Sequence, residues 1–176
     1  MAGIDLSREF KPIRIAVLTV SDTRERANDT SGDLLEQRIK DAGHVLAARD
    51  LVRDDVAAIR SRVAGWIGSR EVDAVISTGG TGLTGRDVTI EALRPLFDKE
   101  IEGFSAVFHQ ISYGTVGTST MASRATAGLA QGKLIFCLPG STGACKDGWD
   151  GILQHQLDNR HRPCNLVDLM PRLMER

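Results

Sequence analysis

Glycine and threonine crowd one short stretch of the chain, VISTGGTGLTGRDVTIEAL (75–93). Because glycine loses more backbone freedom on folding than any other residue, such a density requires a structural or functional reason. Glycines allow backbone N–H groups to face an anion, and a helix that follows adds the positive end of its dipole. The stretch follows an apolar run and ends in Arg86-Asp87, so we favour a phosphate-binding loop over a flexible surface turn.

Carboxylates near this loop could bind a metal ion. Asp54 and Asp55 are adjacent and precede a segment with helical spacing, so one is expected to cap a helix and the other is left free. Asp87 could likewise be a helix cap. Mg²⁺ usually binds one or two carboxylates together with substrate phosphates, which suits paired acids beside a phosphate loop. From spacing alone, metal-assisted phosphate chemistry and a pair of helix caps are equally favoured.

Other nucleotide-binding and catalytic patterns are weak or absent. The P-loop pattern GxxxxGK[ST] does not occur. The dinucleotide pattern GxGxxG matches at 80–85, with Glu100 near the expected spacing of roughly 20 residues, but Glu100 lies between two predicted helices. The histidines form no metal-binding cluster. Cys137 and Cys145 lie in apolar segments, where a buried small hydrophobe is favoured over a nucleophile.

Strands and helices alternate along the predicted chain. Nearly continuous apolar runs predict strands at 14–20, 44–52, 72–77 and 133–138. Helical spacing predicts helices at 30–43, 55–69, 88–97, 103–113, 121–130 and 145–153. Thr30 and Asp33 resemble a capping box at the first helix, and Gly43 stands where a left-handed residue would end it.

This alternation predicts an α/β fold: a three-layer, doubly wound, mostly parallel sheet with helices on both faces. We expect a single domain over residues 1–176, with an N-terminal tail at 1–12 and a C-terminal extension at 158–176. Ligands in such sheets bind beyond the carboxyl ends of the strands. Four polar loops are predicted at that edge and together suit phosphate and a metal ion: SDTRERANDTSG, RDD, STGGTGLTGRD and LPGSTG.

The composition is that of an ordinary globular protein, with a net charge of -1. No basic stripe supports nucleic-acid binding, and no apolar stretch approaches the roughly 18 residues of a membrane span. The three cysteines lack zinc spacing, and their odd number argues against a disulfide framework. We therefore expect a cytoplasmic protein that binds neither nucleic acid nor a membrane.

Several motifs in a fixed order resemble the MoaB/MogA family of molybdenum cofactor biosynthesis. The glycine-rich segment STGGTGLTGRD carries the resemblance most strongly. It extends over nearly the whole chain through VLTVSDTR, DTSG, EIEGFSAVF, TMASRATAG and LPGSTGAC. The ending LDNRHRPCNL is more similar to the B branch of the family than to its adenylyltransferase branch.

The resemblance implies a reaction and a set of site residues. Active members of the family transfer AMP from Mg-ATP to the terminal phosphate of molybdopterin, giving adenylyl-molybdopterin and pyrophosphate. Carried over to this chain, Asp54 and Asp87 would be catalytic and would hold Mg²⁺. The residues implied to bind phosphate, pterin and nucleotide are Thr78, Gly79, Gly80, Thr81, Gly82, Ser123, Gly140 and Ser141.

The resemblance also implies partners, and it leaves other functions open. The family forms homo-oligomers, either trimers or hexamers, and other proteins of molybdenum cofactor biosynthesis are further candidate partners. Apolar residues of the C-terminal extension are expected to pack on the body or on a neighbouring copy: Leu166, Val167, Leu169, Met170, Leu173 and Met174. A non-catalytic molybdopterin-binding or carrier protein on the same fold is the first alternative, and a dinucleotide-dependent oxidoreductase is the second.

Overall fold

A computed structural model describes residues 3–175 of the chain, and its centre is a β-sheet. The strands are β1 (Gly3–Ile4), β2 (Arg14–Val20), β3 (Val45–Val52), β4 (Ala74–Thr78), β5 (Lys99–Glu100), β6 (Thr126–Ala130), β7 (Lys133–Leu138) and β8 (His161–Arg162). Six of them form the central sheet in the order β3-β2-β4-β7-β6-β5. β2, β3, β4 and β7 run parallel, whereas β6 is antiparallel to both β7 and β5.

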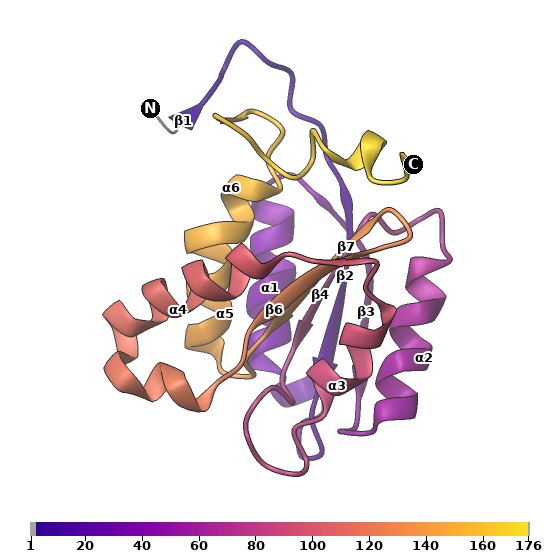
Figure 1. Cartoon of the computed structure of the whole chain (residues 1–176), viewed down its shortest axis with the longest axis vertical. Helices are drawn as coiled ribbons and strands as arrows, with labels where there is room; N and C mark the ends of the chain where they lie inside the picture. Colours follow the sequence, from indigo (N-terminus) through magenta and orange to yellow (C-terminus); the bar gives the residue numbers. More distant parts are fainter. Residues whose placement is uncertain (1–2, 176) are drawn as a thin grey trace.

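Helices cover both faces of this sheet. The α-helices are α1 (Thr30–Asp41), α2 (Val56–Ile67), α3 (Thr89–Leu93), α4 (Glu102–Val116), α5 (Thr142–Gly148) and α6 (Gln154–Gln156). The 3-10 segments are η1 (Arg26–Asn28), η2 (Arg94–Leu96), η3 (Gly117–Ala122) and η5 (Met170–Arg172), and η4 (Trp149–Leu153) is a π-helical segment. α1, α4 and α5 lie on one face and α2 and α3 on the other (Figure 1). The predicted three-layer α/β fold is confirmed.

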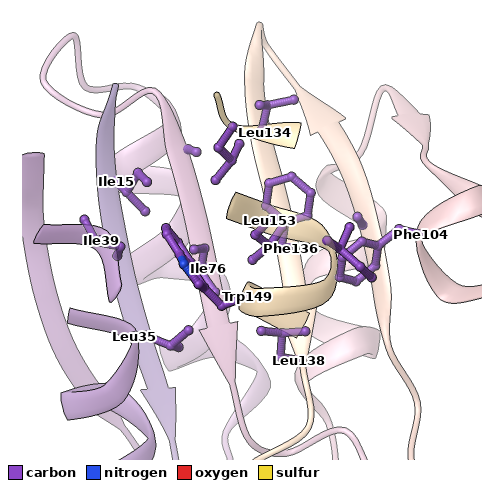
Figure 2. Packing of buried hydrophobic residues seen from close by; sticks show 14 of the residues in the cluster. Ile15, Leu35, Ile39, Ile76, Phe104, Leu134, Phe136, Leu138, Trp149 and Leu153 are labelled. Carbon is purple, nitrogen blue, oxygen red and sulfur yellow. The ribbon is translucent and has the colours of Figure 1, made fainter. Parts of the chain in front are cut away.

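Alternate residues of the central strands pack into two separate cores. In β2, Ile15 and Val17 belong to the core beneath α1, α4 and α5, and Leu18 belongs to the core beneath α2 and α3. Figure 2 shows the first of these cores, where the indole of Trp149 lies next to Ile76. Because both sheet faces are buried, the strands have nearly continuous apolar sequences, and these apolar runs are what predicted them.

The helix predicted at 121–130 is wrong. Residues 117–122 form η3, and residues 126–130 form β6, which pairs with both β7 and β5. Small residues in this segment are compatible with a helix, but tertiary packing decides its structure. Gly128 is the clearest sign: a Cβ at this position would lie 2.3 Å from the Phe97 ring, so the strand passes directly beneath that ring.

Helix caps differ from the prediction at one helix and agree at another. The capping box of Thr30 and Asp33 is wrong, because the N-cap of α1 is Asp29, whose side chain accepts from the Gly32 N–H at 3.0 Å. Gly43 does adopt the left-handed conformation, with φ +84°. Asp55 caps α2 by accepting from the Ala58 N–H at 2.8 Å, so the adjacent Asp54 is left free of that role, as predicted.

The two ends of the chain contact each other at the side of the sheet opposite to the carboxyl ends of the parallel strands (Figure 1). β1 pairs antiparallel with β8, and Arg8 forms a bidentate ion pair with Asp168 at 2.8 and 2.9 Å. Four of the apolar residues of the extension pack against the core, as predicted: Leu166, Val167, Met170 and Leu173. Leu169 and Met174 are exposed. Within residues 3–175, no helix is long and apolar enough to cross a membrane.

Candidate functional site

A cleft of about 350 Å³ opens at the carboxyl ends of the parallel strands. In the strand order, β3 lies on one side of β2 and β4 lies on the other, so the chain reverses its direction of winding between β2 and β4. Such a topological switch point is the usual ligand position in parallel sheets. Parts of all four predicted polar loops line this cleft. So do all the residues implied by the family resemblance: Asp54, Thr78, Gly79, Gly80, Thr81, Gly82, Asp87, Ser123, Gly140 and Ser141.

The chain itself packs against the first glycines of the loop. Gly79 and Gly80 have φ of +98° and +63°, in the left-handed region that favours glycine. A Cβ at Gly79 would lie 2.1 Å from the carbonyl oxygen of Val20, and one at Gly80 would lie 2.6 Å from Oδ1 of Asp54. These glycines therefore allow the loops after β2, β3 and β4 to approach one another closely. Glycine is needed here for this packing, in addition to the predicted binding of phosphate.

Arg124 fixes the orientation of the glycine loop, a role that the sequence analysis missed. Its Nε donates to the carbonyl oxygens of Thr81 and Gly82 at 3.1 and 3.0 Å, and its Nη2 donates to that of Asp87 at 3.1 Å. The C=O and N–H of a trans peptide point in opposite directions, so carbonyls held by Arg124 turn the following N–H groups away from it. The sequence signal was a single arginine in SRATAG, directly after Ser123.

Asp87 orders the loop and does not cap the following helix. Its Oδ2 accepts from the hydroxyl and the N–H of Thr84 at 2.6 and 3.0 Å, and these bonds lower the pKa of the Asp87 carboxyl. The N-cap of α3 is Val88, which makes no side-chain capping bond. The helix-cap interpretation of Asp87 is therefore wrong, and the carboxylate is ionised at neutral pH.

Asp54 lies in an unfavourable field for a carboxylate. Burial raises its pKa first, and repulsion by Asp22 and Asp87 raises it further. Arg86 lowers the pKa of Asp54 only in part, because its guanidinium pairs with Asp22 at 2.5 Å and is otherwise exposed. Asp22 in turn accepts from the backbone N–H of Asp54 at 3.2 Å. Arg86 does not line the cleft, and its ion pair with Asp22 connects it to the loop after β2.

The carboxylates fit a magnesium ion that arrives with phosphate. No group of three or more His, Cys, Asp or Glu side chains with metal-binding geometry occurs among residues 3–175, so the protein offers no complete cage. Mg²⁺ needs none, since it commonly binds one or two carboxylates and takes its other ligands from phosphates and water. Asp54 and Asp87 would be the two carboxylates, and a divalent cation between them would relieve their mutual repulsion.

Arg24 is the basic side chain among the residues lining the cleft, within the described chain. Its Nη1 donates to the Ser31 hydroxyl at 2.8 Å and lies 3.6 Å from the Asp29 carboxylate. Asp29, only 1% exposed, is itself fixed by a 2.8 Å ion pair with Arg49. Ser31 and Asp29 therefore fix the Arg24 guanidinium in an orientation in which it can bind an anionic ligand without rearranging. The motif SDTR was predicted to lie in a loop at this edge, but its arginine was not among the predicted site residues.

Cys145 is excluded as a nucleophile, as the sequence analysis favoured. Its Sγ lies 3.0 Å from the Thr78 hydroxyl, which donates to the carbonyl oxygen of Pro139 at 3.0 Å. Burial raises the pKa of the Cys145 thiol to about 11, so the thiolate is scarce at neutral pH. Glu100, the acid of the dinucleotide pattern, lies in β5 at the sheet edge and is bonded to Arg94 and Thr126.

Known proteins match this chain over most of its length. A family model described as a probable molybdopterin binding domain matches residues 16–159. Molybdenum cofactor biosynthesis protein B of Escherichia coli (strain K12) is 51% identical over 160 residues, 91% of this chain and 94% of that protein. A crystal structure of molybdenum cofactor biosynthesis protein B aligns with a TM-score of 0.83 at 41% identity, covering 85% of this chain and 94% of that one. The crystal structure of tungsten cofactor synthesizing protein MoaB from Pyrococcus furiosus gives 0.74 at 39% identity, covering 82% and 92%.

Proposed function

Because this chain belongs to the MoaB/MogA family of molybdenum cofactor biosynthesis, we propose that its cleft transfers AMP from Mg-ATP to the terminal phosphate of molybdopterin. The products are adenylyl-molybdopterin and pyrophosphate. The observation that carries the proposal is the pair Asp54 and Asp87 beside the glycine loop, where burial and then repulsion by Asp22 and Asp87 raise the pKa of Asp54. Two carboxylates that line the same cleft suit a reaction that brings a divalent cation with its substrate.

The reaction needs positioning and charge neutralisation more than a protein nucleophile. An oxygen of the molybdopterin phosphate attacks the α-phosphorus of ATP and forms a new P–O bond. The bond from the α-phosphorus to the bridging oxygen of the β-phosphate breaks, and its electron pair leaves with pyrophosphate. No proton has to be removed from a phosphate oxygen that is already ionised, so the reaction does not need the buried, protonated Cys145, which lies outside the cleft lining.

Each part of the cleft has a role in this proposal. The loop Thr78–Gly82, oriented by Arg124, binds phosphate through backbone N–H groups. Arg24 neutralises charge on the phosphates, and its fixed guanidinium can donate two parallel hydrogen bonds to them. Asp54 and Asp87 would hold Mg²⁺, which when bound supplies positive charge to the ATP phosphates.

The direct test is incubation with molybdopterin, Mg²⁺ and ATP labelled at the α-phosphate. Label should appear in adenylyl-molybdopterin, with one pyrophosphate released for each molecule formed. Binding of molybdopterin without label transfer or pyrophosphate release would contradict the proposal and would identify a carrier protein on the same fold. Quenching of NADH or NADPH fluorescence at micromolar protein would instead indicate the dinucleotide alternative.

We also propose that the chain works as a homo-oligomer, a trimer or a hexamer. Exposed apolar side chains occur on two elements that contact each other, at Val107, Tyr113 and Val116 of α4 and Met121 of η3. Exposed apolar groups gathered on neighbouring elements are typical of a surface that another protein covers.

A further inference from the structure

A cavity of about 340 Å³ lies apart from the cleft, between the N-terminal half of α4 and the segments η4, α6 and β8. Among residues 3–175, it has no lining residue in common with the cleft. Its volume lies within the range of small-molecule sites, roughly 300–1,000 Å³. The proposed function gives this cavity no role.

The inner walls of this α4–η4 cavity are aromatic and apolar. Phe104 and Phe136 line it, and both are buried. Their ring centroids lie 5.4 Å apart at an interplanar angle of 54° (Figure 2). Buried Ile152 of η4 completes this part of the wall. Because aromatic rings pack well in tilted arrangements at such separations, a further ring in the cavity would find favourable partners here.

A π-helical turn shapes one wall of the cavity. η4 supplies Gly151 and Ile152 to the lining, and π-helical turns are rare and often lie at functional sites. Gly151 lets this turn approach α4 closely, since a Cβ there would lie 2.7 Å from Cδ1 of Ile111. Gly103 of α4 and Gly151 are both exposed, so neither side presents a side chain that closes the cavity.

The polar part of the lining is a pair of histidines beside Gln156. His155 of α6 and His161 of β8 have ring centroids 5.1 Å apart at an interplanar angle of 39°. Nδ1 of His161 is buried and has no hydrogen-bond partner among residues 3–175. A buried polar atom without a partner is unfavourable, and such atoms are rare unless water or a ligand completes them.

The lining selects a neutral polar group over a charged one. No lysine, arginine, aspartate or glutamate within the described chain lines the cavity, so an ionised ligand would meet no fixed counter-charge. A hydrocarbon would leave Nδ1 of His161 unpaired. A hydroxyl can donate to an imidazole nitrogen or accept from it, so it suits either tautomer. A phenolic hydroxyl also stays neutral at pH 7, because its pKa is about 10.

We propose that the α4–η4 cavity binds a small aromatic alcohol, whose ring packs against Phe104 and Phe136 and whose hydroxyl pairs with Nδ1 of His161. The inference goes beyond the proposed function and does not depend on it, because the cavity and the cleft are lined by different residues. The chain therefore has a second ligand site, of a different chemical character from the phosphate-binding cleft.

Gly103→Leu fills the cavity from the side of α4. Gly103 lines the cavity, and a Cβ there would meet no described atom within 4 Å, so the fold has room for the side chain. Gly114 is the matched control: it lies in the same helix, its Cβ would also meet nothing within 4 Å, and it lines neither the cavity nor the cleft. His161→Phe removes the unpaired nitrogen and keeps a ring in the wall.

The test titrates the full-length chain into 2-naphthol, whose own fluorescence reports binding, and into naphthalene, which has the same rings without the hydroxyl. The parent should bind 2-naphthol about fivefold more tightly than naphthalene, the contribution of one hydrogen bond. Gly103→Leu should weaken binding of both probes at least ~10-fold, whereas Gly114→Leu should bind both like the parent. His161→Phe should bind the two probes equally. Saturating Mg-ATP should change neither affinity, and circular dichroism verifies that each variant is folded.

Three results would overturn the inference: no binding of 2-naphthol by the parent at millimolar concentration, equal affinity of Gly103→Leu and the parent, or displacement of the probe by Mg-ATP. A fivefold preference for 2-naphthol that survives in His161→Phe would also overturn it, because the hydroxyl would then pair elsewhere. Tyr113, the single tyrosine of the chain, is exposed and is a second source of a phenol ring. If Tyr113→Ala raises the affinity for 2-naphthol, the cavity takes the tyrosine of a neighbouring copy and not a free ligand.

Discussion

Asp87→Asn separates the structural part of the site from its chemistry. In the parent, both hydrogen bonds from Thr84 end on the same oxygen, Oδ2 of Asp87. Asparagine retains one side-chain oxygen of nearly the same position, so both bonds can persist as neutral ones. The substitution therefore removes the negative charge and keeps the shape of the loop.

The expected loss of stability is small and the expected loss of activity is large. Hydrogen bonds to charged groups contribute about 1 kcal/mol more than neutral ones, so unfolding should become easier by about that amount. This corresponds to a fall in Tm of about 2–4 °C for a chain of this length. AMP transfer should fall at least ~100-fold, the loss of about 2.7 kcal/mol of transition-state stabilisation, because one of two proposed carboxylates for Mg²⁺ is gone.

Label transfer from α-labelled ATP measures the activity, and thermal unfolding monitored by circular dichroism measures the stability. Asp55→Asn is the matched control: it removes a charge of the same sign next to Asp54, at a residue that caps α2. Asparagine caps a helix as well as aspartate does, so this control should keep its Tm and its activity. Full AMP transfer by Asp87→Asn would refute the reasoning and leave Asp87 as a loop-ordering residue only.

The remaining predictions concern stability, charge, backbone and assembly. Asp54→Asn should abolish transfer yet raise the free energy of unfolding at neutral pH by less than about 1 kcal/mol, because it removes a carboxylate whose pKa is raised by burial and repulsion. Because the pKa of Asp54 is higher in the folded state, the parent loses stability as pH rises from about 3.9, the unfolded pKa, through the folded pKa. The extra stability of the variant should therefore vanish below pH ~3.9. Extra stability that persists below that pH would contradict a raised pKa at Asp54. Arg24→Ala should weaken pyrophosphate binding about 10- to 100-fold in calorimetry, with Arg24→Lys between it and the parent, and equal affinity in all three would remove Arg24 from the site. Gly80→Val should lower both Tm and pterin binding because φ is +63° there, whereas Gly85→Val, in open space on the same loop, should lower neither. Light scattering should give three or six times the 19.1 kDa chain mass, and a monomer at micromolar concentration would end the oligomer proposal.

The fold was predictable where one rule governed the local sequence. β2, β4 and β7 are covered on both faces, so their apolar runs identified them without any tertiary information. β6 was mistaken for a helix because its identity as a strand depends on its neighbours: it pairs with β5 and β7, and its Gly128 passes beneath Phe97. Nothing within the five residues themselves signals that environment.

The site was predictable in position but not in its connections. Loop composition and the rule for parallel sheets indicated the edge, and the cleft lies there. The pairing of Arg86 with Asp22 and the clamp of Arg124 on the glycine loop join residues far apart in sequence, so no spacing could reveal them. The same holds for Asp87: its position before α3 left a helix cap and a metal ligand equally open, and its carboxylate instead accepts from the hydroxyl of Thr84.

The ribbon of β1 and β8 has a mechanical consequence. Gly3 pairs with Arg162 and Ile4 with His161, so a load applied to the two ends of the chain acts on the Gly3–Arg162 pair before the Ile4–His161 pair. The bonds of an antiparallel pair lie across the strands and would break one after another under such a load, as a zipper opens. The parallel strands β2, β4 and β7 would still be intact at that point, and so would the loops at their far ends. In an optical trap, the chain should therefore lengthen in a first step at low force while the cleft keeps its ligand.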